Sequence, residues 1–395
     1  MNKKISLGLA IALMAIAAAL TFIISTSYSM NIYNDLVADV QQRAQMYTKL
    51  EQIDTYVRAY YDGSIDEDAL IEALAEGYIS VLGKDESSYM DTDEYALYKE
   101  HLSGTHQGIG VYCSNVGGYP TITSVLPDSP ASSAGLKVGE AIVAIGDSEV
   151  QKIGYDNAYA LIRSDAGTLL TLTVRSGGVD RKVSITTTSM NMPSVSTELF
   201  GDYGYIKIYE FGDKSYQQFT AAYSMLTTAG VKGMVIDLRN NDGISHDAAT
   251  NILSAYLPLE SVVAVTEDLD GTQSILSRAT GTNAITVPVT VLTNAKTAGP
   301  AELFAAALRD CIGAEIIGTT TKGEAAYTET YTLYDGAAII LPIATLRSAS
   351  TDYAGTGLKP DFEVVIAEDT NEHLATLDQE TDACLKKALE VLSQH

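Results

Sequence analysis

The chain has 395 residues, of which 46% are hydrophobic and 19% charged, and its formal net charge at pH 7 is −25. This length is too great for one ordinary hydrophobic core and predicts two or three domains. The negative charge repels phosphate backbones, so no nucleic acid is expected as a partner. The three cysteines are far apart and the five histidines lack metal-ligand spacing, so we expect no disulfide framework, no metal and no cofactor.

An uncharged, largely apolar run at the N-terminus extends from Ile5 to Ile24 and follows Lys3 and Lys4. A helix of this length, rising about 1.5 Å per residue, just spans a bilayer core. The lysines favour a cytoplasmic N-terminus. Residues 1–30 are therefore predicted to be a cytoplasmic stub and transmembrane anchor, placing the protein in the cell membrane with its bulk extracytoplasmic. The alternative is a signal peptide cleaved near Ser27–Ser29, which would give a secreted protein.

Residues 31–103 are rich in Asp and Glu and carry apolar residues at helical spacing. A break at Asp62–Ser64 separates two such runs. The pattern predicts a helical arm. One interpretation of this arm is a stalk that holds the following domains away from the membrane.

Residues 104–188 contain Gly108, Ile109, Gly110 and Val111 in sequence, followed by the S-P-A and A-G-L motifs of residues 129–136. Successive backbone N–H groups in such a glycine-rich loop can hold a peptide carboxylate while the peptide adds as a strand. Together the motifs resemble a PDZ domain. The resemblance implies a peptide-binding site at these four residues, whereas a PDZ domain that serves only as an internal brace is the alternative.

Residues 189–372 alternate between strand and helix patterns, which predicts an α/β core with a mainly parallel sheet. The expected strands are 204–208, 287–292 and 315–318, with a further strand and its exit loop at 231–241. The expected helices are 216–229, 247–257 and 301–309. Residues 373–395 are predicted to form a C-terminal helix.

The segment Asn294–Asp310 resembles the nucleophile segment of the carboxyl-terminal processing peptidases, which are tail-specific serine proteases. The I-D-L-R-N-N motif at 236–241 and the G-T-G-L-K-P-D motif at 355–361 also resemble this family. The likeness covers roughly residues 65–368. It implies a serine-type endopeptidase that processes protein C-termini, built as a peptidase core, a PDZ domain and a helical arm. For residues 31–103 the likeness adds a second interpretation, a dimerisation arm.

The catalytic positions of that family are substituted in this chain. Gly299 stands where the family has its serine nucleophile, and a glycine has no side chain to attack a peptide bond. The family's general-base lysine falls on Glu324, counted either from Gly299 or backwards from the Asp335–Gly336 turn. The helper glutamine falls on Thr328. Lys322 becomes the lysine only if a deletion and a compensating insertion are both assumed.

The oxyanion positions are altered too. The residue after the nucleophile position is Pro300, which has no N–H to donate. The second donor belongs to a loop in which only Gly243 is retained, with Asp242 before it and Ile244 after it.

Two other arrangements of nucleophilic residues are weak. Ser245, His246 and Asp247 are consecutive, and neighbouring side chains cannot meet as a catalytic triad does. Thr297 precedes the helix without an evident base.

The favoured interpretation is a catalytically inactive member of this family that binds protein or peptide C-termini. Expected associations are the membrane through the N-terminal helix and either a homodimer or pairing with an active relative. The alternatives are an active endopeptidase that uses Lys322 and a purely structural scaffold.

Overall fold

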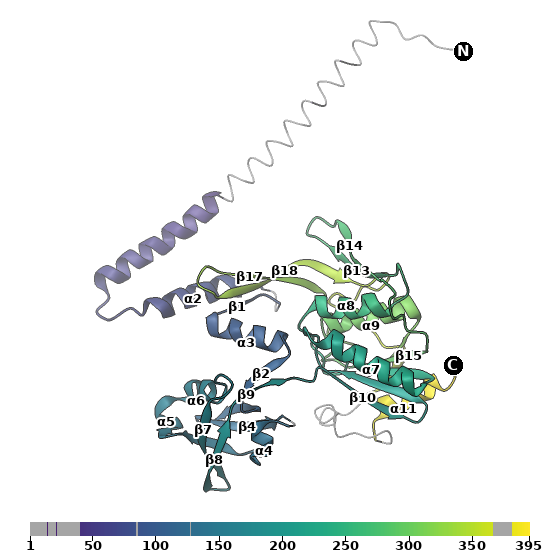
Figure 1. Ribbon diagram of the computed structural model, residues 1–395. Coiled ribbons are helices and arrows are strands. Elements are labelled where there is room, and N and C mark those ends of the chain that lie inside the picture. The colour runs from purple at the N-terminus through teal and green to yellow at the C-terminus, as the bar shows by residue number, and fades with distance from the viewer. Residues whose placement is uncertain (1–13, 15–20, 22–39, 84–85, 127, 366–380) are drawn as a thin grey trace. The chain divides into compact units, whose positions relative to one another are not determined.

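The computed structural model describes residues 14, 21, 40–83, 86–126, 128–365 and 381–395 (Figure 1). The chain divides into two compact units, Met1–Ile71 and Glu72–His395. In the first unit, residues 40–60 form a helix whose aromatic side chains, such as Tyr56 and Tyr60, are exposed. Arg58 of this helix pairs with Asp54 and Glu67, at 2.8 and 2.6 Å. Helix α2 (Glu67–Ser80) begins in this unit and ends in the second.

The predicted transmembrane helix requires a correction. Among the residues that the structure describes, no helix is both long and apolar enough to cross a membrane. The prediction of a transmembrane helix is therefore not supported. Apart from Met14 and Thr21, the run Ile5–Ile24 lies outside the described residues.

A strand interrupts the predicted helical arm of residues 31–103. Strand β1 (Ser88–Met90) pairs with β18 (Ala338–Arg347), and helix α3 (Thr92–Leu102) follows it. Three residues are too few to show the alternation that identifies a strand in a sequence. A reciprocal capping box between Asp91 and Glu94 starts α3.

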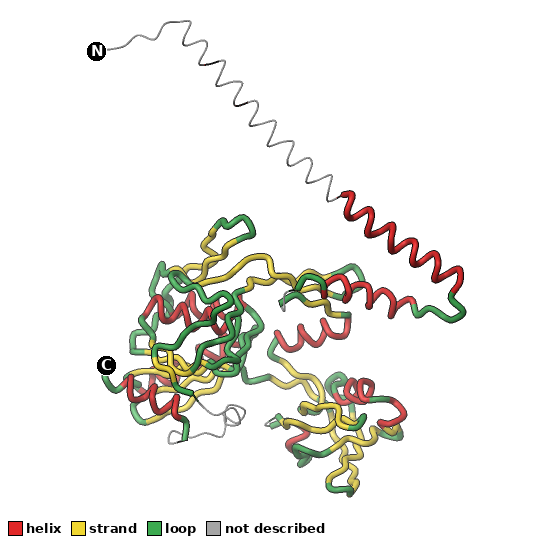
Figure 2. The backbone as a smooth tube through the Cα atoms, turned by 180° about the vertical axis from the view of Figure 1, so that it is seen from behind, coloured by secondary structure: helices red, strands yellow, loops and turns green. Residues whose placement is uncertain are grey.

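Residues 105–191 form a small antiparallel β domain (Figure 2). Its main sheet has the order β3-β4-β5-β7-β8, so β3 is an edge strand, while β6 pairs with β5 and β2 with β9. The strands are β2 (Thr105–Gly108), β3 (Val111–Val116), β4 (Tyr119–Val125), β5 (Ala141–Ile145), β6 (Ser148–Glu149), β7 (Leu169–Ser176), β8 (Val179–Thr186) and β9 (Thr188–Asn191). The helices are α4 (Pro130–Ser133), α5 (Val150–Ile153) and α6 (Tyr155–Ile162).

The larger part is an α/β core whose sheet has the order β10-β11-β12-β15-β16-β19. Strands β10 and β11 pair antiparallel and the other pairs are parallel, as the strand–helix alternation predicts. The strands are β10 (Val195–Phe200), β11 (Tyr203–Ile208), β12 (Gly233–Asp237), β15 (Val289–Thr293), β16 (Glu315–Gly318) and β19 (Phe362–Glu363).

Helices cover both faces of this sheet (Figure 1). Met234 and Ile236 of β12 pack with helices α7 (Ser215–Ala229), α8 (His246–Tyr256) and α9 (Pro300–Ile312). Val235 points to the other face and packs with α11 (Ala383–Leu392). Because successive side chains of a strand point to opposite faces, one buried strand supplies both hydrophobic layers.

A second, antiparallel sheet joins β1 and β18 to three further strands. These are β13 (Val262–Glu267), β14 (Gln273–Arg278) and β17 (Ala326–Thr332). The loop that leads into β17 contains Lys322 and Glu324, so this sheet helps to position these two residues.

Candidate functional site

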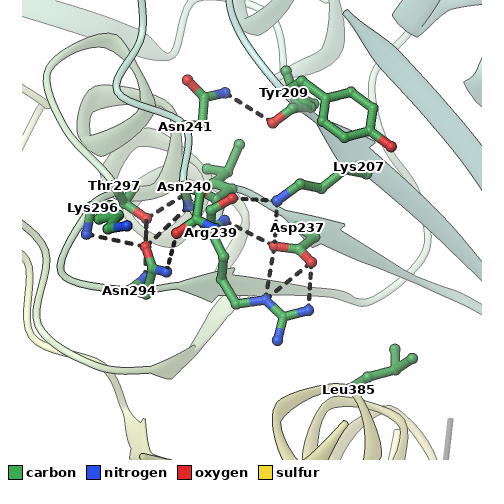
Figure 3. A network of polar contacts seen from close by, with 12 residues as sticks. Lys207, Tyr209, Asp237, Arg239, Asn240, Asn241, Asn294, Lys296, Thr297 and Leu385 are labelled. Atoms are coloured by element: carbon green, nitrogen blue, oxygen red, sulfur yellow. Dashed lines mark hydrogen bonds and ion pairs between the residues drawn. The ribbon is translucent and has the colours of Figure 1, made fainter. Parts of the chain in front are cut away.

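Two loops at the carboxyl ends of neighbouring parallel strands are fastened together by side-chain hydrogen bonds (Figure 3). The Asn294 amide oxygen accepts the backbone N–H of Asn240 at 3.0 Å, and its amide nitrogen donates to the Asn240 side chain at 2.7 Å. The Thr297 hydroxyl donates to the carbonyl of Leu238 at 2.9 Å. Thr297 is fully buried, so its hydroxyl is a structural tie and is not available as a nucleophile.

Gly299 lies at the turn that leads into α9, with φ 51° and ψ −116°. A residue with a side chain is strained in this left-handed conformation, which glycine adopts freely. Space is not the obstacle, because a Cβ built on Gly299 would lie 3.8 Å from the nearest atom, the Asp242 carbonyl oxygen. Glycine therefore suits the backbone conformation at position 299, and it supplies no nucleophilic side chain.

Glu302, in the first turn of α9, brings the nucleophile and base positions together. Its buried carboxylate accepts the N–H groups of Gly299 at 3.1 Å, Gly323 at 2.7 Å and Glu324 at 2.8 Å, and also the hydroxyl of Thr321. Gly299 and Glu324 donate to the same oxygen, Oε2. Burial raises the pKa of Glu302, although these hydrogen bonds oppose the effect. The positions matched by counting along the sequence are thus spatial neighbours.

The backbone donors around Gly299 are already engaged within the protein. Gly243 donates its N–H to the Asn241 side-chain oxygen at 2.9 Å, and Ala301 donates to the Ala298 carbonyl at 3.0 Å. Pro300 has no N–H, and its ring packs on Gly243 so closely that a Cβ there would lie 2.4 Å from the Pro300 Cδ. An oxyanion forming at Gly299 would therefore find no ready donor among Gly243, Gly299, Pro300 and Ala301.

Lys322 and Glu324 form an ion pair with each other, and their side chains are 52% and 23% exposed. A lysine becomes a general base when burial without a counter-charge disfavours its protonated form. Lys322 has the opposite surroundings, since it is exposed to solvent and faces a carboxylate.

A cavity of about 260 Å³ lies between the segment of residues 244–247 and strand β17. It is lined by Thr328, the helper-glutamine position, and by Ile244, from the second oxyanion loop, together with Ser245, His246, Asp247 and Tyr327. The Ser245 hydroxyl accepts the N–H of Ala248 as the N-cap of α8. The His246 Nε2 is buried and has no hydrogen-bond partner among the described residues. These contacts give no catalytic relay through the three consecutive polar residues.

The half-buried His246, whose Nε2 is shielded from solvent, predicts a loss of stability in acid. Burial lowers its pKa from 6.5 to about 4. An unfolded chain therefore takes up a proton that the folded chain refuses, so stability falls as the pH drops from about 6.5 towards 4, by at most about 3 kcal/mol. Urea unfolding followed by circular dichroism at pH 7 and pH 4.5 should show a smaller acid loss for His246→Gln than for the wild type. Equal losses would contradict this assignment.

A buried charge network under the site was not found by sequence reasoning (Figure 3). Arg239 binds Asp237 with its Nη2 at 2.6 Å and Asp382 at 2.6 Å, and Lys207 Nζ lies 3.2 Å from Asp237. Burial alone would raise the pKa of Asp237, but the charges of Lys207 and Arg239 outweigh it and hold that pKa well below its usual range. Lys207 is a buried lysine committed to a structural ion pair. Asp382 also caps α11, so the network attaches this helix to the sheet.

The predicted carboxylate loop lies between β2 and β3. The N–H of Ile109 donates to the Ile162 carbonyl at 3.1 Å, and the Gly110 carbonyl accepts the N–H of Leu126 at 3.0 Å. Gly108 has φ 119°, and a Cβ on it would lie 2.4 Å from the Ile162 carbonyl oxygen. The loop is thus held against the end of α6, and Val111 continues from it into edge strand β3.

The fold and these motifs are similar to those of PDZ-containing peptidases of the carboxyl-terminal processing type. Residues 202–364 match the family model described as peptidase family S41, and residues 121–176 match a PDZ domain model. The resemblance to carboxyl-terminal processing peptidases with a PDZ domain, stated from the sequence, is confirmed.

Three relatives illustrate the match. The chain is 27% identical over 325 residues to the carboxy-terminal processing protease CtpA of Bacillus subtilis (strain 168), covering 82% of this chain and 70% of that protein. It is 29% identical over 315 residues to the carboxy-terminal-processing protease of Bartonella bacilliformis, covering 78% and 72%. It is 28% identical over 299 residues to a probable CtpA-like serine protease of Staphylococcus haemolyticus, covering 75% and 60%.

Among solved structures, a photosystem II D1 C-terminal processing protease aligns with a TM-score of 0.48 at 21% identity, covering 80% of this chain and 86% of that one.

Proposed function

We propose that this chain is a catalytically inactive member of its peptidase family that binds the C-terminal ends of peptides or proteins through its PDZ domain. One observation carries the proposal of inactivity: no side chain is available at Gly299, and its neighbouring backbone donors are already engaged or absent. Loss of the nucleophile of a serine protease costs on the order of 10⁶ in kcat. Loss of one oxyanion donor costs about 10²–10³.

Peptide binding is supported by features that do not depend on the lost catalytic groups. The edge strand β3 can accept a further strand, and the glycine-rich loop of residues 108–111 stands at its start. Binding of this kind needs backbone hydrogen bonds and a carboxylate site, and no nucleophile. The cavity beside Thr328 would then be a place to hold a chain without cutting it. Homodimerisation, pairing with an active relative and an extracytoplasmic location stay predictions.

The alternative, an active enzyme that uses Lys322, is disfavoured by the exposure of this lysine and its ion pair with Glu324. The two proposals predict different results with a denatured protein substrate. We expect purified wild-type protein to give no more hydrolysis than Lys322→Ala, measured by release of new amino termini. Clear cleavage by the wild type that disappears in Lys322→Ala would overturn the inactive proposal. Lys296→Ala, which removes another lysine from a neighbouring loop, is the matched control.

A further inference from the structure

A carboxylate from α3 occupies an anion site beside the predicted peptide loop. Glu100 accepts the backbone N–H of Gln107 at 2.5 Å and the Nη2 of Arg163 at 2.8 Å. Gln107 directly precedes Gly108, the first residue of the loop. The Glu100 and Arg163 side chains are only 18% and 14% exposed. A backbone N–H and a guanidinium are the donors that also suit the terminal carboxylate of a peptide.

Arg163 lies against the loop and retains binding capacity. Its Cα would be 2.8 Å from a Cβ built on Gly108. Its Nε is buried and has no hydrogen-bond partner among the described residues. The Arg163 Nη1 lies 3.4 Å from the His106 Nδ1, so Glu100 and His106 together leave the Nε unused. A ligand able to use more of its donors could compete with Glu100 for them.

An apolar cavity adjoins this ion pair. It has a volume of about 210 Å³, and Leu97, Tyr112, Tyr159 and Met192 line it together with Arg163. Apolar walls with a few convergent polar groups are typical of ligand sites. The cavity is suited to the apolar last side chain of a peptide whose carboxylate reaches Arg163.

Helix α3 connects this ion pair to the cavity between residues 244–247 and β17. Tyr98 and Leu102 line the cavity that Ile244 and Thr328 also line. His101, next to Glu100, lies 2.6 Å from Glu210 of the peptidase core. Release of Glu100 would therefore remove one attachment of a helix that also forms a wall of the second cavity.

We propose that Glu100 is an internal competitor for peptide C-termini: it closes the carboxylate site, and a peptide with a free carboxylate and an apolar last residue displaces it. This inference rests on the proposed peptide-binding function. Replacing Glu100 with a neutral residue leaves the largely buried Arg163 charge without its partner, which favours an incoming carboxylate. If the closed form predominates about tenfold, removing the competitor tightens apparent binding by about tenfold.

The test uses the full chain and a short fluorescein-labelled peptide that ends in leucine, as the free acid and as the amide. Fluorescence anisotropy should show Glu100→Gln binding the acid about tenfold tighter than the wild type, with no gain for the amide. Asp93→Asn removes an equal charge from an exposed position of the same helix and should match the wild type. Adding Arg163→Gln to Glu100→Gln should abolish the gain, and Glu100→Ala should reproduce it.

The other outcomes separate this inference from the proposed function. If the wild type prefers the acid to the amide and Glu100→Gln and Glu100→Ala bind it no tighter, the competitor role is wrong and peptide binding stands. If the variants gain equally for acid and amide, the carboxylate role is wrong. If neither wild type nor variants bind either peptide, both the inference and the proposed peptide-binding function fail.

Discussion

Gly299→Ser alone is expected to leave hydrolysis of a denatured protein at the wild-type level. The new hydroxyl has room, but the backbone at this position costs a residue with a side chain about 1–3 kcal/mol. Glu324 still stands at the position of the family's lysine base. Pro300 still offers no N–H, and the N–H of Gly243 still binds Asn241. We expect turnover to require at least Gly299→Ser, Pro300→Ala and Glu324→Lys together.

New amino termini released from a denatured protein are the measurement for these variants. Gly299→Ala is the matched control, because it introduces the same backbone strain without a hydroxyl. Hydrolysis by Gly299→Ser that clearly exceeds that of Gly299→Ala would show that a base and an oxyanion site survive in the wild-type fold.

Arg239→Met is expected to lower the free energy of unfolding by about 3–5 kcal/mol, because it leaves buried carboxylates without their main partner. Arg239 and Asp237 side chains are 2% and 1% exposed, and Asp382 is 4% exposed. Lys207 and Tyr205 continue to bind Asp237, whereas Asp382 loses its guanidinium partner. The attachment of α11 to the sheet should weaken most.

Urea unfolding followed by circular dichroism measures this effect. Arg175→Met is the matched control, since Arg175 forms an ion pair of the same length, 2.6 Å, with Asp180 at side-chain exposures of 44% and 43%. Such an exposed pair contributes about 0–1 kcal/mol. Similar losses for Arg239→Met and Arg175→Met would mean that the buried network contributes little to stability.

The sequence predicted the parts of the fold and site that leave local patterns. Alternating strands and helices indicated the core sheet, and fixed spacings paired Gly299 with Glu324, which the structure places on one carboxylate oxygen of Glu302. The helix expected at 301–309 is found as α9, which begins at Pro300. These features depend on residues close in sequence or on a motif with a fixed length.

Contacts between distant residues could not be predicted in this way. Arg239 and Asp382 are 143 positions apart. No local sequence pattern at either residue indicates that it contacts the other. Glu100 binds Arg163 across 63 positions. The hydrogen bond from the Gly243 N–H to the Asn241 side chain joins residues close in sequence. It depends on the Asn241 rotamer, which the sequence does not specify. The motif I-D-L-R-N-N contained Asp237 and Arg239, and their charges within a buried strand and its exit were the available signal.

Recovery of a bound peptide tests the central claim, binding without cleavage, most directly. The wild-type chain is incubated with an excess of a peptide ending in leucine with a free carboxylate, and the complex is separated and analysed by mass spectrometry. The account predicts that the protein retains the peptide at its original mass after prolonged incubation, and that the amidated peptide is retained much less. Shortened peptide products formed by the wild type, but not by Lys322→Ala, would contradict it.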